Sequence, residues 1–233
     1  DEVDSTMAEA ARVADRLAGP EWIMAHRQSA ARGRRGRPWR DPGGNFAATL
    51  VMRPQGGPGQ AALRSFVAAL ALREALADLT GAPEALALKW PNEVLVNGGK
   101  AAGILLETVG PQGGALAIGV GVNLIAAPGA DEVEAGAVEP VSILAETGVR
   151  IAPEAMLEAL AFAFAGWEAR LATYGFGPVR EAWLSHAARL GDTVTARLPG
   201  SAVSGVFETV DEHGAIVLKT AEGRRAIAAA ELF

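Results

Sequence analysis

"KWPNEVLVNGGKAAGILLE", residues 89–107, is the stretch that decides the fold. Apolar residues flank an Asn97-Gly98 pair, which is a strong local signal for a tight β-hairpin because both residues tolerate a positive φ. The stretch also holds Lys89 and Lys100, and the next lysine in the chain is at position 219. The sequence therefore predicts two antiparallel strands with both lysines beside one turn. An exposed hairpin with ordinary surface lysines is the alternative interpretation.

The composition limits the class of protein. The chain has 233 residues, half of them hydrophobic, which is enough for a substantial core in one large domain or in one medium and one small domain. The formal net charge of −6 argues against general nucleic-acid coating, which needs a basic surface. There is no cysteine, no export signal and no apolar run of about 18 residues. We expect a cytoplasmic protein that binds neither membranes nor nucleic acid.

Periodicity on both sides of the hairpin predicts an α+β fold. Thr6 and Glu9 have the spacing of a capping box at the start of a first helix. Strands are expected at 21–27, 46–54, 85–90 and 114–124, and helices at 59–81, 141–148, 153–175 and 178–187. Four short strand-like runs follow, at 192–198, 202–210, 215–220 and 224–230. We expect a catalytic domain over residues 1–186 and a small β-barrel domain over 187–233.

A second stretch, "AARGRRGRPWR" at residues 30–40, concentrates positive charge. It holds five of the 21 basic residues and two glycines, and it has no acid. The planar guanidinium group grips phosphate or carboxylate with two hydrogen bonds, and glycine lets backbone amides approach a ligand closely. The stretch therefore predicts a loop that binds an anion. A basic linker or a nucleic-acid patch remains the alternative.

Taken together and in order, five stretches resemble the biotin protein ligase family. They are "DST" at 4–6, "QSAARGRRGRPW" at 28–39, "KWPNE" at 89–93, "KAAGIL" at 100–105 and "GVGVN" at 119–123. The resemblance implies a mixed β-sheet with flanking helices, similar to class II aminoacyl-tRNA synthetases, followed by an SH3-like barrel. It also implies a reaction: biotin and ATP give biotinyl-5′-AMP, and biotin then passes to a lysine of a biotin carboxyl carrier protein.

The resemblance implies a role for each matching residue. Lys100 and Arg34 would be catalytic, and magnesium would enter with ATP near Asn92 and Glu93. The biotin contacts would come from Ser5, Thr6, Gln28, Arg32, Gly33, Arg34 and Lys100. The ATP contacts would come from Arg34, Arg37, Trp39, Lys89, Asn92 and Asn123. The segment 126–140, which is rich in glycine and acid, would be a mobile second loop over the adenine.

Three positions depart from the family pattern. Met7 replaces an asparagine, Ala31 replaces a glycine and makes a left-handed backbone costly, and Glu93 replaces an aspartate. None of these changes removes a charge, so we expect activity. The type expected is monofunctional, because no DNA-binding segment is visible before Asp1, and a homodimer is one possible assembly. A lipoate or octanoate ligase of the same fold and a nucleic-acid-binding module are the competing interpretations.

Overall fold

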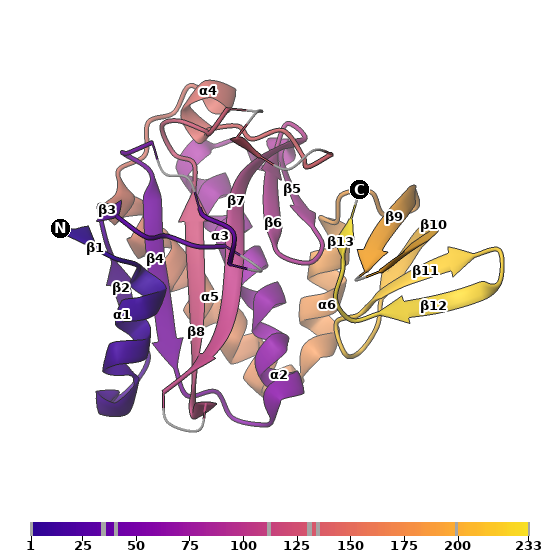
Figure 1. Ribbon diagram of the computed structural model, residues 1–233, viewed down its shortest axis with the longest axis horizontal. Coiled ribbons are helices and arrows are strands. Elements are labelled where there is room, and N and C mark those ends of the chain that lie inside the picture. Colours follow the sequence, from indigo (N-terminus) through magenta and orange to yellow (C-terminus); the bar gives the residue numbers. More distant parts are fainter. Residues whose placement is uncertain are drawn as a thin grey trace.

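The computed structural model describes residues 2–33, 36–39, 42–110, 113–129, 132–133, 136–198 and 200–232. A six-stranded sheet with long helices on one face forms the larger part, and a five-stranded sheet stands beside it at the C-terminal end (Figure 1). The larger sheet has the order β2-β4-β8-β7-β6-β5, and each neighbouring pair is antiparallel. Its strands are Glu21–Met24 (β2), Phe46–Met52 (β4), Leu86–Lys89 (β5), Glu93–Val96 (β6), Gly99–Val109 (β7) and Ala115–Val122 (β8).

Two predictions about helices were wrong in detail. The N-cap of the first helix is Ser5 and not Thr6, because the Ser5 hydroxyl accepts a hydrogen bond from the Met7 amide. The single helix expected over 59–81 is two helices. At the break, the Arg64 guanidinium donates to the Gln60 carbonyl at 2.9 Å. The helices are Thr6–Val13 (α1), Pro58–Ala62 (α2), Arg64–Thr80 (α3), Ile143–Thr147 (α4), Pro153–Tyr174 (α5) and Phe176–Ser185 (α6), with short 3-10 turns at Ala14–Arg16 (η1) and Pro83–Ala85 (η3).

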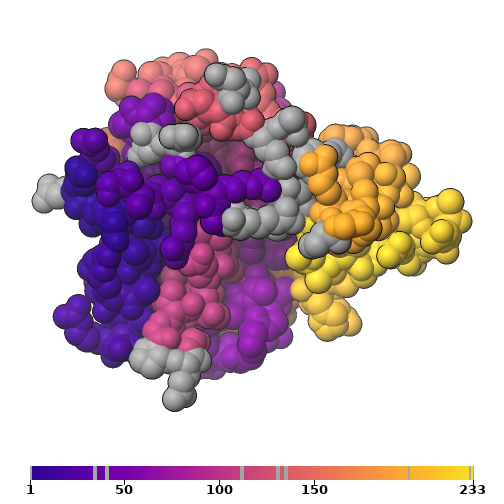
Figure 2. Space-filling model, viewed as in Figure 1, coloured from indigo at the N-terminus to yellow at the C-terminus, as the bar shows by residue number. Residues whose placement is uncertain are grey.

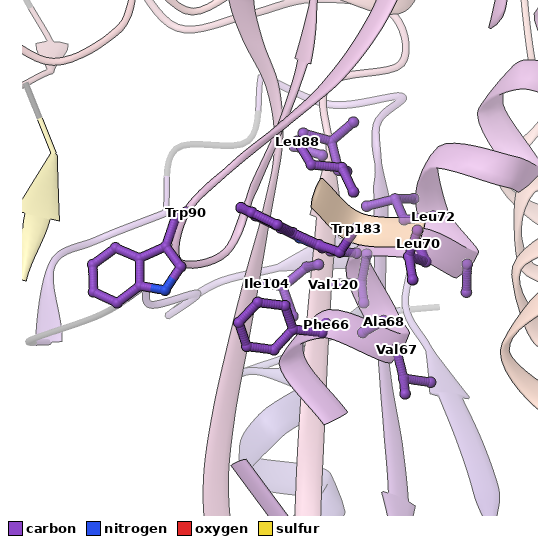
Figure 3. Packing of buried hydrophobic residues seen from close by; sticks show 14 of the residues in the cluster. Phe66, Val67, Ala68, Leu70, Leu72, Leu88, Trp90, Ile104, Val120 and Trp183 are labelled. Atoms are coloured by element: carbon purple, nitrogen blue, oxygen red, sulfur yellow. The ribbon is translucent and has the colours of Figure 1, made fainter. Parts of the chain in front are cut away.

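The two faces of the larger sheet are buried by different elements. Alternate residues of β4 and β8 pack with α3 and α5, in the core that Figure 3 shows around Phe66 and Trp183, whose rings meet edge to face at 5.3 Å. On the opposite face, Val51 packs with α1 in a smaller apolar cluster. Strand β4 is therefore buried along its whole length. The rest of that second face is left for the site described below.

The C-terminal module is all β, as predicted. Its strands follow the order β12-β11-β10-β9-β13 and pair antiparallel throughout. They are Thr193–Leu198 (β9), Ser201–Val210 (β10), Ile216–Thr220 (β11), Gly223–Ile227 (β12) and Glu231–Leu232 (β13), the last of which was not predicted. Parallel pairing occurs between Glu2–Val3 (β1) and Arg27–Gln28 (β3). The α+β class with mixed pairing is confirmed, and the boundary placed at 186–187 falls between α6 and β9.

A turn of the C-terminal module packs against the larger part. The Trp90 indole is 1% exposed, and its Nε1 donates to the Gly214 carbonyl at 3.1 Å. Gly214 has a φ of +83°, and a Cβ atom there would lie 2.9 Å from the Phe66 ring. Only glycine fits this position, because it tolerates the left-handed backbone and leaves room for the ring. The contact joins the C-terminal module to the residue that follows Lys89.

This contact can be tested with two glycine substitutions in the same module. Gly200 also has a positive φ, of +77°, but a Cβ there would meet no atom within 4 Å. Both Gly214→Ala and Gly200→Ala carry a left-handed strain of about 1–2 kcal/mol. Gly214→Ala should lower the free energy of unfolding by about 1–3 kcal/mol more, because of the clash with Phe66. Urea denaturation measures both, and equal losses would contradict the packing described.

Candidate functional site

A cavity of about 360 Å³ opens on the second face of the larger sheet. This volume lies at the lower end of the range for small-molecule sites. The cavity is lined by strands β7 and β8, the start of α1, residues 31–33 and 37–39, and parts of 128–140. In Figure 1 the segment after β3 crosses in front of β8 and β7, and Figure 2 shows its described residues on the surface of the same face. The cavity therefore brings together residues that are 40 or more positions apart in the sequence.

A set of hydroxyl and amide groups lies at the end of the cavity nearest α1. The Thr6 amide and hydroxyl both donate to Gln28 Oε1, at 2.9 and 3.2 Å. The Thr6 hydroxyl in turn accepts a hydrogen bond of 2.8 Å from Thr49. Ser5 uses one lone pair for the Met7 amide, so its hydroxyl proton remains available to a ligand. The structure thus brings together Ser5, Thr6 and Gln28, three residues to which the resemblance assigns biotin contacts.

Two lysines and one carboxylate form a charged cluster in the cavity wall. Lys100 Nζ lies 2.5 Å from Glu93 Oε1, and Lys89 Nζ lies 2.8 Å from Glu93 Oε2. Burial alone would raise the pKa of Glu93, but the charges and hydrogen bonds of Lys100 and Lys89 outweigh it and lower that pKa. Glu93 therefore carries a full negative charge and holds two ammonium groups side by side at the cavity wall.

A β-bulge aims Lys100 at the cavity. Val94 pairs with Ala102 and Leu95 pairs with Lys100, so Ala101 is an extra residue in β7. An extra residue reverses the alternation of side chains along a strand. Lys100 and Gly103 therefore share a face although they are three residues apart, and Lys100 Cε lies 3.9 Å from where a Gly103 Cβ would be. The hairpin at Asn97-Gly98 is confirmed, with positive φ at both residues.

The Trp39 indole packs against two glycines of the sheet. Gly103 of β7 pairs directly with Gly121 of β8. A Cβ atom on Gly121 would lie 2.8 Å from the indole, and one on Gly103 would lie 3.2 Å from it. Gly121 of "GVGVN" and Gly103 of "KAAGIL" thus make room for a side chain from the arginine-rich loop. Gly119 does the same for Met7, whose sulfur would be 2.8 Å from a Cβ there.

The described part of the arginine-rich loop folds back on itself beside the cavity. The Gly33 amide donates to the Arg37 carbonyl at 2.7 Å, and the Trp39 amide donates to the Ala31 carbonyl at 2.9 Å. Arg32 pairs with Glu107 at 3.0 Å and, like Gly33 and Arg37, lines the cavity. Arg34, predicted to be catalytic, lies outside the described residues. Ala31 is not left-handed, so the backbone cost expected there is absent.

Two asparagines also line the cavity. Asn92 lines the cavity, and its side-chain amide donates to the Ile104 carbonyl. Asn123 is 3% exposed, and its Nδ2 donates to the Val141 carbonyl at 3.1 Å. Within the described residues, Asn123 Oδ1 has no hydrogen-bond partner. A buried acceptor without a partner is costly, so this atom calls for an N–H or O–H donor from a ligand or from water.

The end of the segment 126–140 lies along the start of β7. The Lys100 amide donates to the Glu139 carbonyl at 2.7 Å, and the Val141 amide donates to the Lys100 carbonyl at 3.0 Å. This pairing keeps the backbone at Lys100 between two segments. Pro128, Val133 and Val138 of the segment line the cavity, as expected of a second loop over the site.

Sequence reasoning missed two contributors. Thr49 is completely buried on β4 and was treated only as part of a strand, yet its hydroxyl contacts Thr6. A hydroxyl in the otherwise apolar run "FAATLVM" was the available signal. Glu107 was also missed, and only its position on the face shared with Lys100 and Gly103 explains its pairing with Arg32.

Comparison with known proteins gives the class. The chain belongs to the biotin/lipoate A/B protein ligase family, whose model matches residues 3–124. A second model, the C-terminal domain of biotin protein ligases, matches residues 190–233. The resemblance inferred from the motifs is therefore confirmed.

Individual relatives narrow the class further. The biotin–[acetyl-CoA-carboxylase] ligase of Paracoccus denitrificans is 55% identical over 99% of this chain and 97% of its own length. The bifunctional ligase/repressor BirA of Bacillus subtilis is 28% identical, and the match covers 90% of this chain and 65% of that protein. The biotin protein ligase of Aquifex aeolicus, solved with biotin and ATP, has the same fold, with a TM-score of 0.83 at 24% identity, covering 100% of this chain and 95% of that one.

The pairing of Glu93 with two lysines makes the stability of the fold depend on pH. Because the pKa of Glu93 is lower in the folded state, its ionised carboxylate stabilises the fold at pH values above the ordinary glutamate pKa of about 4.3. This contribution disappears as the pH falls through the lower pKa of the folded state. Glu93→Gln should therefore lower the free energy of unfolding at pH 7 by about 1–3 kcal/mol, because two ammonium groups lose their partner. The difference from wild type, measured by urea denaturation, should shrink below about pH 4. A difference that stays constant with pH would contradict the pairing.

Proposed function

We propose that the chain activates biotin with ATP and transfers the biotinyl group to a lysine of a biotin carboxyl carrier protein. The observation that carries the proposal is the cavity itself. Hydroxyl and amide groups at one end suit a ureido head, and two ammonium groups further along suit a carboxylate and phosphates. The family match and the 55% identical Paracoccus ligase support the same assignment.

The first step would join an acid to a phosphate. A carboxylate oxygen of biotin attacks the α-phosphorus of ATP, the bond from that phosphorus to the bridging oxygen breaks, and pyrophosphate leaves. Both reactants are anions, so positive groups must offset their repulsion and the charge on the phosphoryl oxygens in the transition state. Lys100, aimed into the cavity by the bulge, would lie at the carboxylate and the phosphate under attack. Lys89 would hold the nucleotide phosphates.

Glu93 would keep this pair of lysines ready. With both carboxylate oxygens engaged, the two ammonium groups are held at fixed positions before any ligand arrives. An entering phosphate or carboxylate competes with Glu93 for the lysine protons. The cost of repositioning flexible side chains is thereby reduced.

The second step would form an amide. The neutral amine of the carrier lysine attacks the acyl carbon of biotinyl-5′-AMP, the bond from that carbon to the phosphate oxygen breaks, and AMP leaves as the amine gives up a proton. The mixed anhydride is open to hydrolysis, so a covered site protects it. Trp39 and the described part of the arginine-rich loop, which lie over β7 and β8, would exclude water and pack against the nucleotide.

Magnesium would enter with ATP rather than on a site built by the protein. Among the described residues no group of three His, Cys, Asp or Glu could hold a metal ion. Both oxygens of Glu93 already accept hydrogen bonds from lysine, so this carboxylate does not fit a protein-held ion. Mg²⁺ is commonly held through nucleotide phosphates. These contacts argue against the assignment of magnesium to Glu93, and the assignment to Asn92 stays a prediction.

The direct test supplies biotin, MgATP and a carrier domain to the purified chain. Biotin attached to the carrier, detected with labelled streptavidin and dependent on ATP, would support the proposal. Lipoate or octanoate attached in place of biotin would overturn it in favour of the related acyl ligases. Salt-sensitive DNA binding without ligation would overturn it in favour of a nucleic-acid module.

No helix in the described part of the chain has the length and hydrophobicity of a membrane span.

Lys100→Ala should abolish most of the first step while the fold is kept. We expect the rate of biotin-dependent ATP–pyrophosphate exchange to fall by roughly 100-fold or more, as is typical when a transition-state charge partner is removed. Lys219→Ala is the matched control, because Lys219 is exposed on β11 away from the cavity. Equal rates in the two variants would remove Lys100 from the catalytic role.

Asn123→Ala should act on the nucleotide. Its unpartnered Oδ1 would accept a hydrogen bond from the nucleotide, so we expect KM for ATP to rise by about five- to tenfold. KM for biotin should change much less. Steady-state exchange kinetics with each substrate varied in turn measure both. An equal rise in the two KM values would indicate a structural role instead.

A further inference from the structure

The hydroxyl network at the α1 end of the cavity has a fixed direction. Gln28 Oε1 can only accept hydrogen bonds, and the Thr6 backbone N–H donates to it, which fixes the orientation of the amide. The Thr6 hydroxyl has a single proton and gives it to the same oxygen at 3.2 Å. The 2.8 Å contact between the hydroxyls of Thr49 and Thr6 must therefore take its proton from Thr49.

This direction determines what the cavity offers to a ligand. Gln28 turns its Nε2 away from the Thr6 contact, and within the described residues this group makes no hydrogen bond, so it can donate. Thr6 has spent its proton and one lone pair, so its hydroxyl can only accept. A donor and an acceptor side by side match a group that carries both C=O and N–H. The ureido head of biotin is such a group.

We propose that Thr49 is a positioning residue that fixes the donor and acceptor pattern of the biotin site. Thr49 is completely buried on β4 behind Thr6 and is not part of the cavity wall, so it acts through Thr6 without touching the ligand. It lies opposite Gly119 of β8, where a Cβ atom would lie 3.6 Å from the Thr49 hydroxyl and in the space that Met7 fills. The proposal rests on the function proposed above.

The test replaces the hydroxyl and keeps the volume. In Thr49→Val the Thr6 oxygen loses its donor, and a buried acceptor without a partner disturbs the position of its side chain. We expect KM for biotin to rise by roughly five- to tenfold, with KM for ATP and kcat nearly unchanged. Thr49→Ser keeps a hydroxyl and should restore the wild-type KM. Thr49→Ala is the second removal variant if the valine variant does not fold.

Two controls separate positioning from general damage. Val51 lies two residues further on the same face of β4, is completely buried and packs in the apolar cluster with α1. Val51→Ala should lower the melting temperature and leave KM for biotin unchanged. In a Thr6→Val background, adding Thr49→Val should cause no further rise, because Thr49 acts through the Thr6 hydroxyl.

The outcomes distinguish this proposal from the function beneath it. Failure of the wild-type chain to bind biotin by calorimetry would overturn the function. Biotin binding with an unchanged KM in Thr49→Val would overturn only the role of Thr49. An equal rise in KM for both substrates, or a full effect of Thr49→Val in the Thr6→Val background, would also overturn it. A rise specific to biotin that serine reverses supports it.

Discussion

The pairing of Gly103 with Gly121 across β7 and β8 is the constraint on which the site depends. Two glycines opposite each other leave a bare strip of backbone in an otherwise closely packed sheet. The Trp39 indole fills that strip, and with it the described part of the arginine-rich loop comes to lie at the cavity. Gly119 repeats the device for Met7. These glycines serve close packing, and the same packing builds the walls of a ligand site.

A second feature, the pairing of two lysines with Glu93, places charge in the same cavity. A chain with a net charge of −6 brings two of its three lysines onto one carboxylate, and a bulge turns one of them toward the cavity. Lysine suits this role because its compact ammonium group needs no fixed planar geometry and can exchange a carboxylate partner for a phosphate. Glutamate in place of the expected aspartate has the length to reach both ammonium groups. The departure at Glu93 is thus compatible with the chemistry proposed.

Much of the site was predictable because local signals and short motifs defined it. The Asn97-Gly98 turn specified the hairpin, and the order of the motifs specified the family. The order of the strands in the sheet could not be predicted from such local signals. Strand β8 lies between β4 and β7, and only this order sets Gly103 opposite Gly121 and Thr49 opposite Gly119. The break at Leu63 was also missed, because apolar periodicity continues through it while a side-chain hydrogen bond from Arg64 accompanies the interruption.

The C-terminal module contributes to the site from outside. Its turn at Gly214 accepts the hydrogen bond of Trp90, and Trp90 lies in the turn between Lys89 at the end of β5 and Glu93 at the start of β6. A buried indole tied at its nitrogen has little freedom to move, so the backbone on both sides of it is restrained. Leu232 of the last strand also lines the cavity. The small module therefore supports the charged wall by packing, which explains why a glycine is required at a turn that carries no catalytic group.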